Sequence, residues 1–396
     1  MITLDPVHSL LVAVLVLLIG TVVNRRVALL SRYNIPDPIT GGLLFAVCAS
    51  VVWATTDYRI NFDQTLKPVL LLMFFAGVGM CADLRMLKKG GKALVLFLMV
   101  LLPFIIVQNA VGFSVARLLD LHPIFGLVGG SITLVGGHGT GAAYAERFAE
   151  VNNLQSVMEL SMTVATMGLI AGGIIAGPVA EWLIKRNQLR SNVSVEERAD
   201  NEENASRITT VGMIGALAGI LVAVVLGRWL GARFSGGTIT IPSFLWCMLI
   251  GVAIRNLLPF ARVQLDDRAS DLISGVCLSL FLVMTMMALN LVEVAQSAGP
   301  FLIIIAAQIV AISLYAAFVC FRVMGRDYEA AVTSAAFIGF NMGSTATAMA
   351  NMQAITGKYG PAPQSYLIVP LSGAFFIDIM NAFLLTATLA LPFIGG

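Results

Sequence analysis

The amino-acid sequence predicts an all-α polytopic membrane protein made of two inverted-topology repeats of about five transmembrane helices, each with a re-entrant hairpin. Three observations lead to this fold class. The composition is 58% hydrophobic and only 12% charged, whereas soluble domains carry roughly 25% charge. About ten apolar segments are long enough, or nearly so, to span a bilayer. Two stretches too polar or too glycine-rich for ordinary spans occupy corresponding places in the two halves.

The apolar segments define the expected order of elements. They fall at residues 8–24, 39–55, 66–82, 93–119 and 154–184 in the first half, and at 209–232, 241–258, 271–292, 299–321 and 362–394 in the second. Residues 186–207 form the one strongly hydrophilic run, which is typical of a linker. We therefore expect an N-terminal membrane repeat over 1–185, a cytoplasmic linker over 186–207 and a C-terminal membrane repeat over 208–396.

The basic residues set the expected orientation. If the N-terminus lies outside and each polar stretch enters and leaves on one side, 18 of the 24 Lys and Arg residues fall in internal loops and 6 outside. Cytoplasmic loops of membrane proteins carry such an excess. We therefore expect both termini outside and the central linker in the cytoplasm.

The two halves begin on opposite sides of the membrane, because each holds an odd number of spans. Weak similarities also recur in the same order. GTGAA over 139–143 resembles GSTATA over 343–348, and Gln155-Ser156 matches Gln364-Ser365. Inverted-topology repeats are typical of secondary transporters, so the pattern favours that class of protein.

Residues 124–147 form the first unusual stretch, in which 7 of 24 residues are glycine. So much glycine destabilises a lipid-facing helix, and irregular backbone at membrane depth occurs only where protein or water surrounds it. We predict a re-entrant hairpin that enters from outside, whose broken helix ends can hold ions and carboxylates. The candidate substrate-binding residues are Ser131, Thr133, Gly137, His138, Gly139, Thr140 and Gly141. A glycine-rich helix-packing interface is the alternative.

Residues 329–352 form the second unusual stretch, which we expect to enter from inside with its tip at 339–345. A set of polar side chains without net charge follows from the tip onward, namely Asn341, Ser344, Thr345, Thr347, Asn351 and Gln353. The candidate substrate-binding residues are Asn341, Gly343, Ser344, Thr345 and Asn351, and Thr347 is a candidate Na⁺ ligand. One more spanning helix with polar packing is the alternative.

Ionisable groups inside the apolar spans are few, and each is costly to bury. Asp378 is the clearest case, because the 11 residues on each side carry no other charge, and Asn381 shares its helix face. We expect both to bind Na⁺, or Asp378 to accept a substrate ammonium; a structural pair with a basic residue is the alternative. Glu159 is either a further Na⁺ ligand or an interfacial side chain. For His138, hydrogen bonding at the hairpin tip is favoured over metal ligation, and proton coupling stays open.

No motif supports an enzyme. The sequence has no GxxxxGK[ST] phosphate-binding loop and no hydrolase signature, and its five cysteines lack metal-ligand spacing. The net charge of +2 is too small for a nucleic-acid binder. We therefore expect no cofactor and no nucleic-acid partner, with membrane lipid around the spans.

Four stretches resemble the bacterial sodium/glutamate symporter family. They are IPDPITGGLL (35–44), GSITLVGGHGTGAA (130–143), NMQAIT (351–356) and VPLSGAFFIDIMNAF (369–383). The likeness covers nearly the whole chain except the central loop. It implies uptake of L-glutamate driven by Na⁺ as the coupling ion, a place in the bacterial cytoplasmic (inner) membrane, and a homodimer. The second stretch departs from the family pattern, which is close to GFGLGATPTAIANMQ, at Asn341, Met342, Ser344 and Ala346.

The resemblance also suggests a mechanism. Intramembrane Lys and Arg are scarce, so the carboxylates of glutamate would meet hairpin N–H groups and hydroxyls. The two tips would meet near the membrane midplane, with glutamate between them, Na⁺ adjacent, and alternating access around that site. Two alternatives stay open: a proton-coupled carboxylate or amino-acid carrier that uses His138, Glu159 or Asp378, and a passive anion channel.

Overall fold

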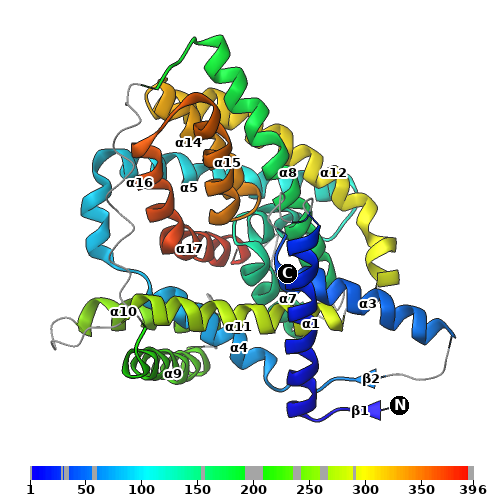
Figure 1. The fold of residues 1–396 in the computed structure, drawn as a ribbon. Helices are drawn as coiled ribbons and strands as arrows, with labels where there is room; N and C mark the ends of the chain where they lie inside the picture. The colour runs from blue at the N-terminus through cyan, green and yellow to red at the C-terminus, as the bar shows by residue number, and fades with distance from the viewer. Residues whose placement is uncertain are drawn as a thin grey trace. The chain divides into compact units, whose positions relative to one another are not determined.

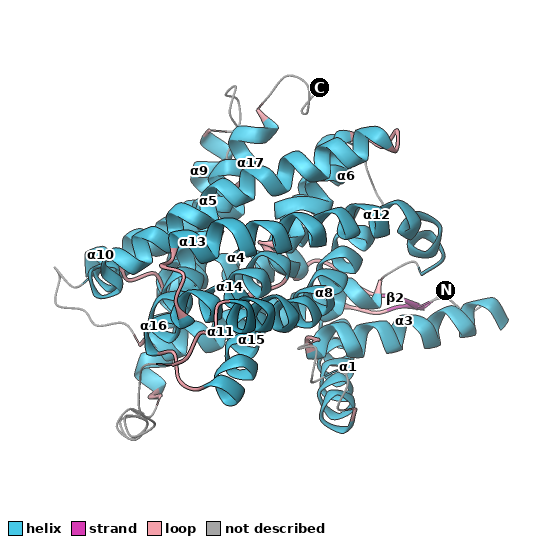
Figure 2. Cartoon of the chain, turned by 90° about the horizontal axis from the view of Figure 1, so that it is seen from above, coloured by secondary structure: helices cyan, strands magenta, loops and turns pink. Residues whose placement is uncertain are grey.

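The computed structural model describes residues 2–27, 30, 35–55, 60–152, 157–191, 208–234, 242–258, 266–288 and 291–390. Within these ranges the chain is helical apart from turns, short connections and one pair of short strands (Figure 1, Figure 2). The strands, Ile2–Thr3 (β1) and Ile60–Asn61 (β2), run parallel with Ile2 opposite Ile60. The predicted all-α class is confirmed.

The chain forms two compact units, and each takes segments from both halves of the sequence. Unit 1 comprises Met1–Cys81, Ala142–Thr163 and Gly212–Gly299. Unit 2 comprises Ala82–Gly141, Val164–Val211 and Pro300–Gly396. Each unit is therefore assembled from stretches on either side of the central linker.

Unit 1 is a bundle of helices joined by close backbone contacts. Its complete or nearly complete helices are α1 (Pro6–Arg26), α3 (Asp37–Thr55), α4 (Lys67–Met80), α9 (Thr210–Arg233), α10 (Ser243–Leu257) and α11 (Asp267–Met287). It also takes most of α7 and the first residues of α8 and α12. Helix α4 packs against α10 and α11, and α11 also packs against α3 and α1. A Cβ on Gly79 would meet the backbone of α10, and one on Gly251 the backbone of α4. Glycine at both positions thus lets α4 and α10 approach closely.

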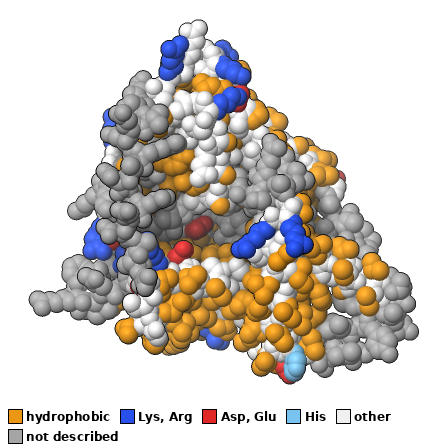
Figure 3. Space-filling view, in the orientation of Figure 1, with side chains coloured by type: hydrophobic (Ala, Val, Ile, Leu, Met, Phe, Trp, Pro, Cys, Tyr) orange, Lys and Arg blue, Asp and Glu red, His pale blue; other side chains and the backbone are white. Residues whose placement is uncertain are grey.

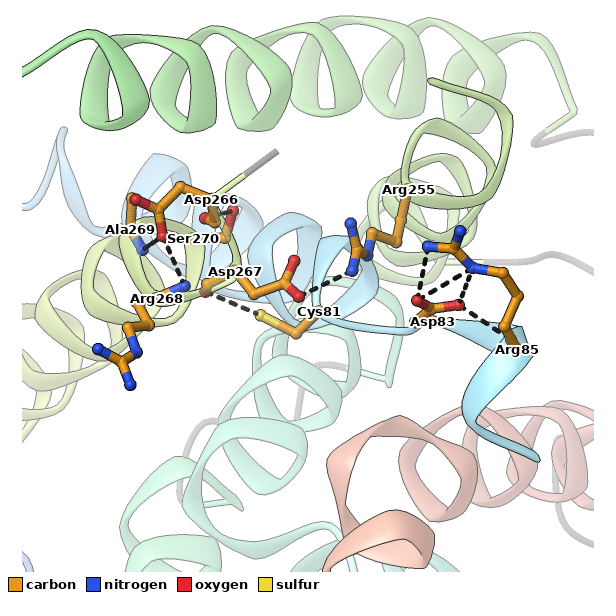
Figure 4. A network of polar contacts seen from close by, with 9 residues as sticks. All are labelled: Cys81, Asp83, Arg85, Arg255, Asp266, Asp267, Arg268, Ala269 and Ser270. Carbon is orange, nitrogen blue, oxygen red and sulfur yellow. Dashed lines mark hydrogen bonds and ion pairs between the residues drawn. The ribbon is translucent and has the colours of Figure 1, made fainter. Parts of the chain in front are cut away.

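Polar contacts join α10 to α11 in unit 1. The Asp266 carboxylate caps α11 by accepting hydrogen bonds from the backbone N–H groups of Arg268 and Ala269, at 3.1 and 3.2 Å. Arg255 donates from Nη2 to Asp267 Oδ2 at 2.7 Å (Figure 4). The end of α10 is therefore tied to the start of α11 by a charged hydrogen bond.

Unit 2 contains the remaining helices. They are the 3₁₀ turn η1 (Leu84–Met86), α5 (Leu87–Leu118), α6 (Pro123–Leu127), the π-helical η2 (Val128–Ile132), the start of α7 (Gly137–Asn152), most of α8 (Val157–Arg186), most of α12 (Leu291–Tyr315), the π-helical η5 (Ala316–Cys320), α13 (Phe321–Val323), α14 (Tyr328–Met342), α15 (Thr345–Tyr359), α16 (Pro363–Leu371), the π-helical η6 (Ser372–Phe376) and α17 (Ile377–Leu389). Phe337 on α14 contacts Phe104 on α5 and Tyr315 on α12, with ring centroids 5.2 and 5.7 Å apart. This aromatic cluster joins three helices of the unit.

Each of the predicted apolar segments contains a helix. Among the described residues, 6 helices are long and apolar enough to cross a membrane: Pro6–Arg26, Gly91–Leu118, Val157–Arg186, Thr210–Arg233, Asp267–Met287 and Gly299–Val323. Hydrophobic side chains cover much of the surface over α1 and α11 (Figure 3). Such a surface is suited to lipid rather than water, and the chain is a multi-pass membrane protein. Residues 362–394, predicted as one span, contain α16 and α17 with a π-helical segment between them.

Candidate functional site

The first glycine-rich stretch folds as two helical arms joined by a turn, and its tip lies in unit 2. The arm formed by α6 and η2 is distorted at Gly130, where φ is −109° and ψ is −136°. A turn at Val135 and Gly136 follows, and α7 begins at Gly137 with φ of +62°. Only glycine adopts that conformation without a steric cost, so the sequence GGHG is suited to this tip.

The second stretch forms a matching hairpin from α14 and α15. Helix α14 ends at Met342, and Gly343 is its C-cap with φ of −164° and ψ of −83°. The Ser344 side chain then caps α15 by accepting a hydrogen bond from Thr347 N–H at 3.3 Å. In both hairpins, the arm after the turn begins at the tip. The first N–H groups of a helix have no partner within the helix, so both tips present such donors.

The two tips lie together within unit 2. A Cβ on Gly137 would lie 3.5 Å from the carbonyl oxygen of Gly343, and one on Gly168 of α8 would lie 2.5 Å from that of Met342. A larger residue than glycine at position 168 would push α8 away from the second tip. The depth of the tips in a membrane stays a prediction.

A pair of amide side chains joins each hairpin to a helix from the opposite half of the sequence. Helix α5 of the first half contacts the second hairpin, and α12 of the second half contacts the first hairpin. Gln108 on α5 donates from Nε2 to the carbonyl of Asn341, in the second hairpin, at 2.8 Å. Gln308 on α12 donates to the carbonyl of Gly129, in the first hairpin, at 3.1 Å. It also donates to the backbone carbonyl of Gln108 at 2.8 Å. The fourth span of each half thus holds the hairpin of the other half.

A second set of hydrogen bonds surrounds Ser131 in the first hairpin. Its backbone N–H donates to Asn109 Oδ1, and its carbonyl accepts from Asn381 Nδ2, both at 2.9 Å. Asn109 follows Gln108 on α5, so the two sets form one connected network. Asn381 lies on α17, one helical turn after Asp378. The network therefore joins the helix of the isolated carboxylate to the first hairpin.

Five buried oxygens in this network accept no hydrogen bond from any described residue. They are Gln108 Oε1, Ser131 Oγ, Gln308 Oε1, Asn341 Oδ1 and Asn381 Oδ1. A buried polar atom without a partner costs about 1–3 kcal/mol, so five in one network call for an explanation. All are uncharged hard oxygens, the ligand type that Na⁺ prefers in carriers. Among the described residues, no group of three or more His, Cys, Asp and Glu could hold a metal ion.

His138 is buried at the first tip, where its Nε2 lies 3.0 Å from Thr166 Oγ1 on α8. The predicted hydrogen bond at the tip is thus present, and it ties the hairpin to α8. Thr140 is also buried close to the tip. Gly139 and Gly141 lie in the first turns of α7.

The other predicted site residues divide between contacts within a hairpin and contacts to α8 or η6. Thr133 donates to the carbonyl of Val128, and Thr347 Oγ1 lies 3.2 Å from Ser344 Oγ. Asn351 donates to the carbonyl of Gly172 on α8 at 3.2 Å. Thr345 contacts η6, at Gly373. These contacts hold the backbone of the two hairpins in place.

The two candidate carboxylates lie in different units. Glu159 belongs to unit 1, while Asp378 and the predicted residues of both tips belong to unit 2. Asp378 is half-buried, and no described residue forms an ion pair or hydrogen bond with it. The alternative of a structural pair with a basic residue therefore finds no support within the described residues.

Sequence reasoning missed Gln308. The mid-span position of Gln108 predicts a hydrogen bond between helices, and the structure contains one, from Gln108 on α5 to Asn341 on α14. The available signal for Gln308 was an amide in an otherwise apolar span, LIIIAAQIVAIS, in the segment that corresponds to the one holding Gln108. Amides in membrane helices commonly hydrogen-bond between helices. Their partners here are more than 170 residues away, which a local pattern cannot identify.

Comparison with known proteins decides the family. The model of the sodium/glutamate symporter family matches residues 2–361. The chain belongs to the sodium/glutamate symporter family. It is 40% identical over 396 residues to the sodium/glutamate symporter of Haemophilus influenzae, which covers 98% of both chains. It is also 40% identical over 400 residues to that of Escherichia coli K12, which covers 99% of both chains.

The resemblance read from the sequence is therefore confirmed. The sodium/glutamate symporter family consists of transporters, which agrees with a multi-pass membrane chain. The matched region contains both hairpins and every residue of the amide network except Asn381, and the likeness to the relatives covers 98–99% of the chain.

Proposed function

We propose that this chain is a secondary active transporter that carries L-glutamate into the cell together with Na⁺. The observation that carries this proposal is the likeness to two proteins named sodium/glutamate symporter over almost their entire lengths. The network of buried oxygens in unit 2 supports it from the structure, because a cation is the simplest partner for acceptors that lack donors.

The proposed architecture is a pair of inverted repeats, over 1–185 and 208–396, joined by the cytoplasmic linker 186–207. The composition of the units supports it. Unit 1 takes the first three spans of each half, and unit 2 takes each half's fourth span, hairpin tip and final span. In α4–α10 the third span of the first half packs on the second span of the second half, and in α3–α11 the two halves have the opposite roles. Gln108 and Gln308 are related in the same way, because each lies on the fourth span of one half and contacts the hairpin of the other. Such reciprocity is expected of repeats related by a two-fold axis.

In this proposal Na⁺ binds where α17 meets the first hairpin. Asp378 supplies a negative charge, and Asn381 and Ser131 supply neutral oxygens that accept no described hydrogen bond. Thr347 and Glu159 remain candidate ligands from our sequence reasoning. A carboxylate with several neutral oxygens is a ligand set suited to a hard monovalent cation.

We place glutamate between the two tips, which are proposed to be re-entrant from opposite sides of the membrane. The N-terminal ends of α7 and α15 both lie at the tips, and helix N-termini attract carboxylates through their N–H groups and dipoles. Two such ends suit a substrate with two carboxylates. Hydroxyl, amide and imidazole side chains of the two hairpins complete the site. They are Ser131, Thr133, His138, Thr140, Asn341, Ser344, Thr345 and Asn351, together with the backbone of Gly137, Gly139, Gly141 and Gly343.

Coupling to Na⁺ follows from the charge of the substrate. Glutamate carries a net charge of −1, and moving it into a negative interior costs about 2.3 kcal/mol per 100 mV. One Na⁺ cancels that charge, and a second lets the membrane potential drive uptake. The resemblance to the sodium/glutamate symporter family is the basis for placing the chain as a homodimer in the bacterial cytoplasmic membrane. The bias of Lys and Arg among its loops is the basis for placing both termini outside.

Uptake into proteoliposomes tests the proposal. Radiolabelled L-glutamate should accumulate against its gradient when Na⁺ is high outside, at equal pH on both sides. A pH gradient without Na⁺ should drive no accumulation. Accumulation with the pH gradient alone would instead establish a proton-coupled carrier, and equilibration without accumulation under either gradient would establish a channel.

A further inference from the structure

A basic pocket lies at the ends of two membrane helices of unit 2, away from the hairpin tips. It has a volume of about 200 Å³ and is formed by the last turns of α8 and by η5, α13 and the turn that follows. Three arginines line it, Arg186, Arg322 and Arg326. Figure 3 shows basic side chains gathered over the end of α8.

Within the part of the chain that the structure describes, no carboxylate neutralises these arginines. The nearest acidic residues in sequence have other partners. Glu181 accepts hydrogen bonds from Lys185 and Lys358, at 3.2 and 2.6 Å. Asp327 accepts from the Ala330 N–H at 2.8 Å. A pocket with three such guanidinium groups is suited to an anion.

Aromatic rings hold two of these arginines in place. The Arg186 guanidinium lies 4.9 Å from the centroid of the Trp182 ring, and that of Arg322 lies 5.2 Å from the centroid of Phe318. Arg322 also donates from Nη1 to the Phe318 carbonyl at 2.6 Å. Stacking of this kind lowers the entropy that each side chain loses on binding an anion. Trp is enriched at membrane–water interfaces, so Trp182 gives the pocket the character of an interfacial site.

Exposed apolar side chains extend from the pocket along both helices. On α12 and η5 they are Val310, Leu314 and Phe318, with 58%, 52% and 45% of each residue exposed. On α8, Ile174 and Trp182 are exposed two helical turns apart, with the exposed Pro178 between them. These stripes run in the direction that acyl chains would take from a headgroup in the pocket. A free anion such as inorganic phosphate would need no such surface.

We propose that this pocket binds the phosphate of an anionic phospholipid, with the acyl chains along the exposed stripes of α8 and α12. Basic pockets between transmembrane helices on the cytoplasmic side suit headgroups of this class. The volume is smaller than the roughly 300–1,000 Å³ of sites for drug-sized ligands, so it suits a headgroup rather than a whole lipid. In the predicted topology the pocket faces the cytoplasmic leaflet.

Native mass spectrometry of the purified full chain tests the proposal, with cardiolipin, phosphatidylglycerol and phosphatidylcholine as separate probes. The anionic lipids should bind in preference to phosphatidylcholine. The double variant Arg322→Gln/Arg326→Gln should lower their affinity about 25-fold, since each arginine near a membrane contributes about fivefold. Arg190→Gln is the matched control, because Arg190 is exposed beyond α8 and does not line the pocket. Affinities of the double variant and the control within twofold of each other would overturn the proposal.

Two further measurements separate the sources of phosphate and require no change to the arginines. Millimolar inorganic phosphate should leave the bound anionic lipid in place; displacement at that concentration would establish a site for free anions instead. Lipids brominated on their acyl chains should quench Trp182 more strongly as phosphatidylglycerol than as phosphatidylcholine. The Trp182 signal is the difference between the parent chain and Trp182→Phe. Equal quenching by the two lipids would exclude headgroup recognition.

Discussion

Replacing Gln108 by Met tests the amide network at its simplest contact. The Gln108 amide donates to the carbonyl of Asn341, which lies in the last turn of α14 and so lacks a donor within its own helix. Met has a similar length and volume, so packing changes little. The substitution leaves a buried carbonyl without a partner, at a cost of up to about 3 kcal/mol, and removes the unpartnered Gln108 Oε1, which relieves about 1 kcal/mol, so the net cost is about 2 kcal/mol. For a unit of moderate size, that lowers the melting temperature by about 4–8 °C.

Gln308→Met is the reciprocal test. It removes two hydrogen bonds, to the carbonyls of Gln108 and Gly129, both within helical segments. Each lost bond costs about 1 kcal/mol, so the fall in stability should be similar. The two variants should differ in which hairpin becomes less stable. Hydrogen–deuterium exchange should increase around 339–345 in Gln108→Met and around 127–133 in Gln308→Met, because each amide holds the hairpin of the other half.

The exposed Gln353 on α15 provides the matched control, since Gln353→Met makes the same chemical change outside the network. Thermal unfolding of the purified chain in detergent, with mass-spectrometric exchange, supplies both readouts. If Gln108→Met and Gln308→Met unfold at the temperature of Gln353→Met, the buried amides do not stabilise the unit. If each variant loosens the hairpin of its own half instead, the reciprocal arrangement is wrong.

Three further predictions concern the tips, the ion site and one surface contact. Asp378→Asn should raise the Na⁺ concentration for half-maximal glutamate uptake at least about tenfold, because a charged ligand contributes about 1.5–3 kcal/mol; unchanged Na⁺ activation would remove Asp378 from the site. Gly137→Val and Gly343→Val should each abolish uptake while the chain still inserts, because position 137 has a positive φ and a Cβ at 343 would lie 2.8 Å from Leu169 Cδ2; normal uptake by either variant, assayed in proteoliposomes, would exclude a shared site. Lys358→Met should leave the free energy of unfolding close to that of the parent chain, because solvent reaches its ion pair with Glu181, whose side chains are 57% and 29% exposed; a denaturant titration that gave a loss comparable to that of Gln108→Met would contradict this.

The sequence was sufficient for the helices and for the two unusual stretches. Apolar runs of span length predict helices through composition alone, and glycine-rich runs such as GGHGTG predict a break because glycine tolerates a positive φ, as Gly137 does. The division into two units could not be predicted in the same way. It depends on contacts such as α4 with α10, between residues far apart in the chain. The donor to Gly129 was missed for the same reason, since Gln308 lies 179 residues away.

The chemistry of the network bears on how the proposed coupling works. A carrier must tolerate its site both empty and loaded. Leaving one partner of a buried ion pair alone costs about 3–5 kcal/mol, whereas a neutral group without a partner costs about 1–3 kcal/mol. Among the described residues of unit 2, the buried atoms without partners are all neutral amide and hydroxyl oxygens.

Asp378 is the one proposed site residue of unit 2 with a charged side chain. Its negative charge is the reason why the site would need a cation. Its carboxylate has no described partner, and it lies one turn before Asn381, which holds the first hairpin. With Na⁺ absent, glutamate would bring a second negative charge toward a carboxylate that already lacks a counter-ion. With Na⁺ bound, that repulsion is removed, and the side-chain oxygens of Asn381 and Ser131 coordinate the ion. In the proposed mechanism, glutamate would then bind well only after Na⁺. Because the substrate would depend on a charge that only the ion supplies, it would not cross without the ion.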